Sequence, residues 1–123
     1  MDASRSPSWH IARTADGAIH ARFIGPTPTA EMYDFIAALN GMMPKANARL
    51  VFDLSELDGY NADTKAPMKT WLLEHKLAIQ EITVVVPKAR TIVKMVVAAI
   101  SLATGIKMQM LEAGEERASY AAP

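Results

Sequence analysis

The chain has 123 residues, half of them hydrophobic, which suffices for one domain with its own core and excludes an extensively disordered protein. Its 13 basic and 13 acidic side chains cancel, so the positive charge typical of proteins that bind nucleic acid or anionic membranes is absent. The chain contains no cysteine, which excludes disulfides, thiolate metal sites and cysteine nucleophiles.

The N-terminal segment and the longest apolar run of the sequence predict where the protein resides. Residues 1–7 are small and polar, and we expect a flexible N-terminal arm there, followed by a single domain at 8–121. The arm lacks the apolar run of a signal peptide. The longest apolar run, residues 95–106, is shorter than the ~20 residues that a membrane span needs. We therefore expect a cytoplasmic protein without integral membrane association.

Two runs of alternating side chains, which begin at Trp9 and Ile19, predict a β-hairpin around Asp16-Gly17. A two-residue loop would place an apolar face opposite a polar one. A three-residue loop with Gly17 in the left-handed region instead sets Trp9 opposite Phe23. Because a slip of one residue turns every side chain to the other face, the three-residue loop is the prediction.

The rest of the chain alternates between helical and strand patterns. Taken in chain order, the predicted elements are a helix at 29–43, a strand at 50–52, a helix at 63–79, a strand at 82–86, a helix at 89–104, a strand at 106–111 and a short helix at 112–121. Alternating strands and helices imply right-handed crossovers. The predicted fold is therefore α/β, with a single layer of about five strands, mostly parallel with an antiparallel N-terminal edge hairpin, and helices packed against it.

An acidic turn with hydroxyl groups is predicted directly after the strand at 50–52. Ligands and partners of α/β proteins usually bind at the carboxyl ends of strands, so Asp53, Ser55, Asp58 and Tyr60 are the predicted partner-binding residues. Two alternatives remain open. One is ordinary turn chemistry, in which Asp and Ser side chains bond to nearby backbone. The other is a Mg²⁺ site built from Asp53, Glu56 and Asp58, since hard cations bind carboxylate oxygens.

The element order and the segment Val51-Phe52-Asp53-Leu54-Ser55 resemble the STAS domains, the fold of the anti-sigma-factor antagonists. They resemble more closely the small bacterial SpoIIAA-like proteins, which include CRAL-TRIO-like lipid-binding relatives. The resemblance covers about residues 8–120 and implies a non-catalytic regulatory role. In the antagonists, a partner kinase phosphorylates a serine that follows a second Asp. Here the corresponding stretch is Asp58-Gly59-Tyr60, so that serine is missing.

The helix predicted at 89–104 carries more apolar surface than a single stripe against a sheet requires. The surplus must contact a neighbouring helix, a second subunit in a homodimer, or an apolar ligand. For the ligand alternative, the residues predicted to bind a lipid-like molecule beneath the helix are Met95, Ala99 and Leu102. The eight methionines of the chain would add adaptable apolar surface.

Few residues offer catalytic or metal chemistry. His10 and His20 fall on one face of the predicted hairpin without a third ligand nearby in sequence, and His75 lies on the inward stripe of its helix. Phosphate-binding loops, nucleophile elbows and paired metal-ligand motifs are absent. We therefore expect no enzyme activity, cofactor or metal. The prediction is a regulatory or protein-interaction module, with a carrier of an apolar, lipid-like ligand as the alternative.

Overall fold

The computed structural model describes residues 9–25, 29–57, 62–87 and 91–112 of the chain. Five strands form one sheet whose order follows the sequence. They are β1 (Trp9–Arg13), β2 (Ile19–Gly25), β3 (Ala48–Leu57), β4 (Ile79–Val86) and β5 (Met108–Glu112). β1 pairs antiparallel with β2, and the later neighbours pair in parallel. The predicted α/β fold with an antiparallel edge hairpin is confirmed.

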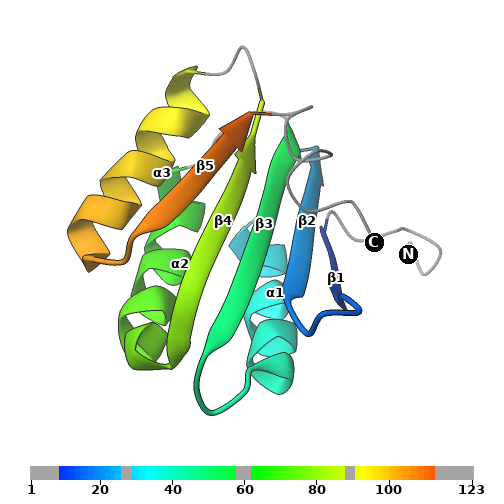
Figure 1. Cartoon of the computed structure of the whole chain (residues 1–123). Helices are drawn as coiled ribbons and strands as arrows, with labels where there is room; N and C mark the ends of the chain where they lie inside the picture. Colours follow the sequence, from blue (N-terminus) through cyan, green and yellow to red (C-terminus); the bar gives the residue numbers. More distant parts are fainter. Residues whose placement is uncertain (1–8, 26–28, 58–61, 88–90, 113–123) are drawn as a thin grey trace, which may run out of the picture.

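The helices connect neighbouring parallel strands. They are α1 (Thr29–Met42), α2 (Ala62–His75), which continues into the short 3₁₀ helix η1 (Lys76–Ala78), and α3 (Thr91–Thr104). Each right-handed crossover moves one strand along in the same direction, so all three α-helices lie on one face of the sheet (Figure 1). We call the opposite face, on which no described helix lies, the helix-free face.

The three α-helices have 14 residues each, about 21 Å of helix. In the part of the chain that the structure describes, none of them is long and apolar enough to cross a membrane.

The hairpin has the predicted register. Trp9 pairs with Phe23, and the Thr14 amide donates to the Ala18 carbonyl at 2.8 Å, which closes a loop of three residues. Gly17 in this loop has φ +91°, a left-handed conformation that glycine adopts without strain.

The same loop holds the carboxylate of Asp16. The Thr14 hydroxyl donates to it, the Ala18 amide donates to it at 3.3 Å, and Arg49 Nη1 lies 3.3 Å from it. These contacts, led by the bond from Thr14, hold the pKa of Asp16 below its usual value of 3.8.

Asp16 should therefore give the fold a small pH dependence in acid. A carboxyl whose pKa is lowered on folding stabilises the protein above its unfolded pKa, and this contribution disappears as the pH falls through the folded value. We expect Asp16→Asn to remove that component. Urea unfolding midpoints measured from neutral pH to below 3.8 would test this. Parallel pH profiles for the variant and the wild type would contradict the prediction.

The core lies between the sheet and its helices and is centred on Phe35 of α1. The Phe35 side chain is fully buried. Its ring contacts Trp9, Phe23 and Phe52 edge to face, with centroid distances of 5.7, 4.8 and 6.3 Å. Three strands are thereby joined to one helix through aromatic contacts, an arrangement that aromatic rings favour.

Several boundaries differ from those predicted. β3 continues to Leu57, five residues beyond the predicted end, and β4 begins at Ile79, which was predicted to be helical. Ile79 pairs with Ala48, so the ladder with β3 extends the strand toward α2. α2 begins at Ala62, one residue before the predicted start, and ends at His75.

The end of α3 agrees with the sequence. Gly105 follows the helix with φ +74°, and its amide donates to the Ser101 carbonyl at 2.9 Å. β5 begins at Met108, two residues later than predicted. The predicted arm at 1–7 and the predicted helix at 112–121 lie outside the described residues, apart from Glu112 at the end of β5.

Candidate functional site

The predicted partner-binding residues divide between strand β3 and the segment that follows it in the sequence. Asp53 and Ser55 lie within β3, so the prediction of a turn directly after Phe52 is wrong. Asp58 and Tyr60 lie outside the described residues.

The turn-forming chemistry of Asp53 and Ser55 is present, but it forms an irregularity in a strand. Asp53 Oδ1 accepts hydrogen bonds from the Ser55 amide at 2.9 Å and from the Ser55 hydroxyl at 2.5 Å. Arg22 pairs with Asp53 while Ile24 pairs with Glu56, so three residue steps on β3 match two on β2. Such a bulge takes a backbone group out of the ladder, and here the side chain of Asp53 bonds to an amide within the bulged segment.

A charged pair lies beside the bulge. Arg22 Nη2 donates to both carboxylate oxygens of Glu56, to Oε2 at 2.6 Å, and both side chains are partly exposed. Ala21 and Phe52 are buried in the core, so the alternation of side chains along each strand places Arg22 and Asp53 on the helix-free face.

The residues around the bulge form one surface, which we call the β3-end surface. It consists of side chains that are exposed or half-buried: Arg22, Ile24, Asp53, Ser55 and Glu56. Two of its members are acidic and one is basic. Ile24 is the one large apolar side chain among them, and it is exposed.

The Mg²⁺ alternative gains no support from this arrangement. The Asp53 carboxylate accepts two bonds from Ser55, and that of Glu56 is paired with Arg22. Among the residues that the structure describes, no group of three or more His, Asp or Glu side chains could hold a metal ion. Asp58, the third acid of the predicted set, lies outside them.

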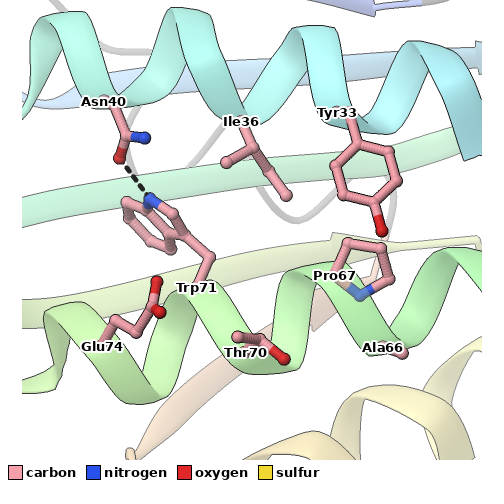
Figure 2. Close-up of a pocket in the computed structure, with 8 residues that line it drawn as sticks. All are labelled: Tyr33, Ile36, Asn40, Ala66, Pro67, Thr70, Trp71 and Glu74. Carbon is pink, nitrogen blue, oxygen red and sulfur yellow. Dashed lines mark hydrogen bonds between the residues drawn. The ribbon is translucent and has the colours of Figure 1, made fainter.

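A second feature is a groove of about 290 Å³ between α1 and α2 (Figure 2). Its lining consists of Tyr33, Ile36, Asn40, Ala66, Pro67, Thr70, Trp71 and Glu74. Figure 2 shows Tyr33 and Pro67 facing one another across one end, with Asn40 and Trp71 at the other. Tyr33 is 59% exposed, so its ring forms part of the rim.

Trp71 forms the best-fixed part of the groove. Its side chain is buried, and its Nε1 donates to Asn40 Oδ1 at 2.6 Å. The His75 ring stacks on it at a centroid distance of 4.4 Å, and His75 Nδ1 lies 2.9 Å from the Trp71 carbonyl oxygen. His75 is thus the half-buried, hydrogen-bonded side chain that its position on the helix predicts.

The groove was not predicted from the sequence. Tyr33, Ile36 and Asn40 follow helical spacing along α1, which was the available signal. Its meaning depends on α2 lying alongside, and sequence periodicity does not identify neighbouring helices.

The predicted ligand residues of α3 face away from the sheet. Met95 is 64% and Leu102 87% exposed, and Ala99 is also exposed. The buried residues of the helix include Val93 and Val97. The prediction that Met95, Ala99 and Leu102 line a pocket beneath α3 is therefore wrong. The apolar stripe that contains Val93 and Val97 is the one that packs against the sheet.

The comparisons with known proteins identify the fold. No protein-family model matches the sequence, and neither does any curated protein. One matching solved structure is an uncharacterized protein of the DUF3478 family with a SpoIIAA-like fold, from Shewanella loihica PV-4. The match has a TM-score of 0.71 at 12% identity and covers 96% of this chain and 97% of that protein. This protein therefore has a SpoIIAA-like α/β fold, as the resemblance in its sequence implied.

Proposed function

We propose that this protein is a non-catalytic, regulatory interaction module that binds a partner protein through the β3-end surface and through Asp58 and Tyr60, which follow β3 in the sequence. The observation that carries the proposal is the cluster of paired polar groups at the carboxyl end of β3, on the helix-free face. Proteins of this architecture usually bind at the carboxyl ends of their strands.

The cluster is suited to recognition because its charged groups are oriented before a partner arrives. Arg22 and Glu56 hold one another in a two-bond pair, and Ser55 fixes the carboxylate of Asp53. Groups that are already ordered lose less conformational entropy on binding. Ile24 supplies exposed apolar area beside these polar groups, and protein interfaces combine both kinds of surface.

The same contacts favour recognition over catalysis. The Ser55 hydroxyl donates to Asp53, but a nucleophile and its base also need a third group that orients the base. Within the described residues, Asp53 is hydrogen-bonded to Ser55 and to no such third group. A fixed carboxylate beside a hydroxyl serves equally well as a bond acceptor and donor toward a partner.

Reversing the charge of Asp53 should weaken binding. Asp53→Lys breaks the bonds from Ser55 and places a cation beside Arg22, so we expect affinity for the partner to fall at least about tenfold. Affinity purification from the native organism with the wild type would identify the partner by mass spectrometry. Titration calorimetry with the purified partner would then compare the variants.

Glu81→Lys is the matched control, since it makes the same charge change on an exposed residue of β4 that pairs with Arg49, toward the opposite end of the sheet. It should bind like the wild type. Tyr60→Ala tests the contribution of the segment that follows β3 in the sequence. If Asp53→Lys and Tyr60→Ala both bound the partner with wild-type affinity, the proposed surface would be ruled out. Equal weakening by Glu81→Lys would indicate a general charge effect.

A further inference from the structure

The outer face of α3 carries a regular row of exposed side chains. Thr91, Met95, Ala98 and Leu102 follow one another in steps of four, three and four residues, and we call this row the α3 seam. Alternating steps of three and four place side chains along one line of a helix, which is the pattern of helices that pair with other helices. All four residues are exposed, and Met95 and Leu102 most of all among the large apolar residues of α3.

The seam has no charge. Lys94 is the sole charged residue in the sequence of α3, and it turns toward β5, where its Nζ lies 2.5 Å from Glu112. A charged partner would therefore find no complementary group on the seam. A second copy of the same surface meets no repulsion there, because a contact across a two-fold axis places each side chain against its own kind of surface.

The side chains in the middle of the α3 seam are small. Ala98 stands between Met95 and Leu102, and Ala99 is exposed beside it. Small side chains at the crossing point let two helix backbones approach closely, while larger side chains on either side fill the remaining space.

From these observations we propose that α3 is the contact between two copies of this chain. The two α3 helices pack antiparallel across a two-fold axis, with Ala98 at their crossing point. Leu102 of one copy then lies against Met95 of the other. The proposal is independent of the β3-end surface, which lies on the other face of the sheet.

The size of the available surface predicts a moderate affinity. A stable complex buries about 800 Å² per partner, more than one helix of about 21 Å provides. Leu77 on η1, 98% exposed, and Leu73 on α2 are further exposed apolar side chains of the helical layer. The side chain of Lys76, on η1, reaches Gly105, the residue directly after α3. We expect a dissociation constant of about micromolar.

A lipid surface is a less suitable occupant. Helices that lie in a membrane interface present bulky side chains such as Trp, Phe and Leu toward the acyl chains. The alanines at the centre of the seam add little apolar area and instead suit a second helix.

Because the chain has no cysteine, a single introduced thiol can report the contact. Under mild oxidation, Ala98→Cys should form a covalent dimer at least about tenfold faster than Tyr33→Cys, whose residue is exposed on α1. Adding Leu102→Glu to Ala98→Cys should reduce cross-linking to the rate of the Tyr33→Cys control. Equal rates for Ala98→Cys and Tyr33→Cys would overturn the proposal.

Sedimentation velocity of the chain without an introduced cysteine provides the second test. Wild type and Tyr33→Glu should dimerise at about micromolar concentration, and Leu102→Glu should raise the dissociation constant at least about 100-fold. A monomeric wild type up to about 1 mM would overturn the proposal, as would dimerisation of Leu102→Glu with wild-type affinity. Sedimentation of a monomeric wild type with phosphatidylserine vesicles, lost in Leu102→Glu, would assign the seam to lipid instead.

Discussion

Phe35→Ala should lower the free energy of unfolding by about 3–5 kcal/mol, because removal of a buried aromatic ring loses its transfer free energy and leaves a cavity. Phe35 is fully buried and contacts aromatic rings from three strands, so the surrounding chain has little freedom to close the gap. Urea unfolding followed by circular dichroism measures the change directly. A loss of this size is a large part of the total stability of a small domain.

Tyr33→Ala is the matched control on the same helix. Its ring is exposed, so the free energy of unfolding should change by no more than about 0.5 kcal/mol. If Phe35→Ala cost less than about 1 kcal/mol, the packing of the aromatic cluster against the sheet would be contradicted.

Trp71→Ala should be comparably destabilising, by about 3–5 kcal/mol. The substitution removes a buried indole, its stacking on His75 and its hydrogen bond to Asn40. Trp71→Phe keeps an aromatic ring but leaves Asn40 without this donor, and should cost about 1–2 kcal/mol. Guanidinium unfolding followed by circular dichroism would measure both variants.

A double-mutant cycle isolates the hydrogen bond between the two helices. Asn40→Ala should destabilise the wild type more than it destabilises Trp71→Phe, by about 0.5–1.5 kcal/mol. Additive costs would mean that the bond from Trp71 to Asn40 contributes nothing measurable. The cycle therefore tests the contact that fixes α1 against α2 along the groove.

Local signals predicted most of the fold. The left-handed preference of Gly17 and the alternation around it determined the register of the hairpin, which the pairing of Trp9 with Phe23 confirms. Gly105 marked the end of α3 in the same way. These features depend on residues close in sequence, so propensity and periodicity suffice to predict them.

The course of β3 could not be predicted from local signals. An Asp followed two residues later by Ser favours the same side-chain bond in a turn and in a bulge. β2, which pairs with β3 as far as Leu57, decides between them. A turn-forming pattern of Asp and Ser two residues apart thus became an irregularity within a strand, and it places Asp53 and Ser55 on the helix-free face.

The orientation of α3 was ambiguous for a related reason. Two apolar stripes run along this helix, and periodicity alone does not show which one packs against the sheet. The structure turns Val93 and Val97 inward and Met95 and Leu102 outward. The groove beside Trp71 likewise depends on two helices from distant parts of the chain.

The sequential order of the strands also affects how this protein folds and which part of its sheet opens first. Among the described residues, every strand pairs with the strand before or after it in the chain, and the parallel pairs join residues from either side of a helix, such as Ile19 and Leu50. Each parallel pair forms only after its helical crossover has closed, so we expect it to form more slowly than the local β1–β2 hairpin. The sequential order also means that α3 and β5 can detach without breaking any pairing among β1 to β4. Hydrogen exchange at β5 should therefore report opening events that the central strands do not share.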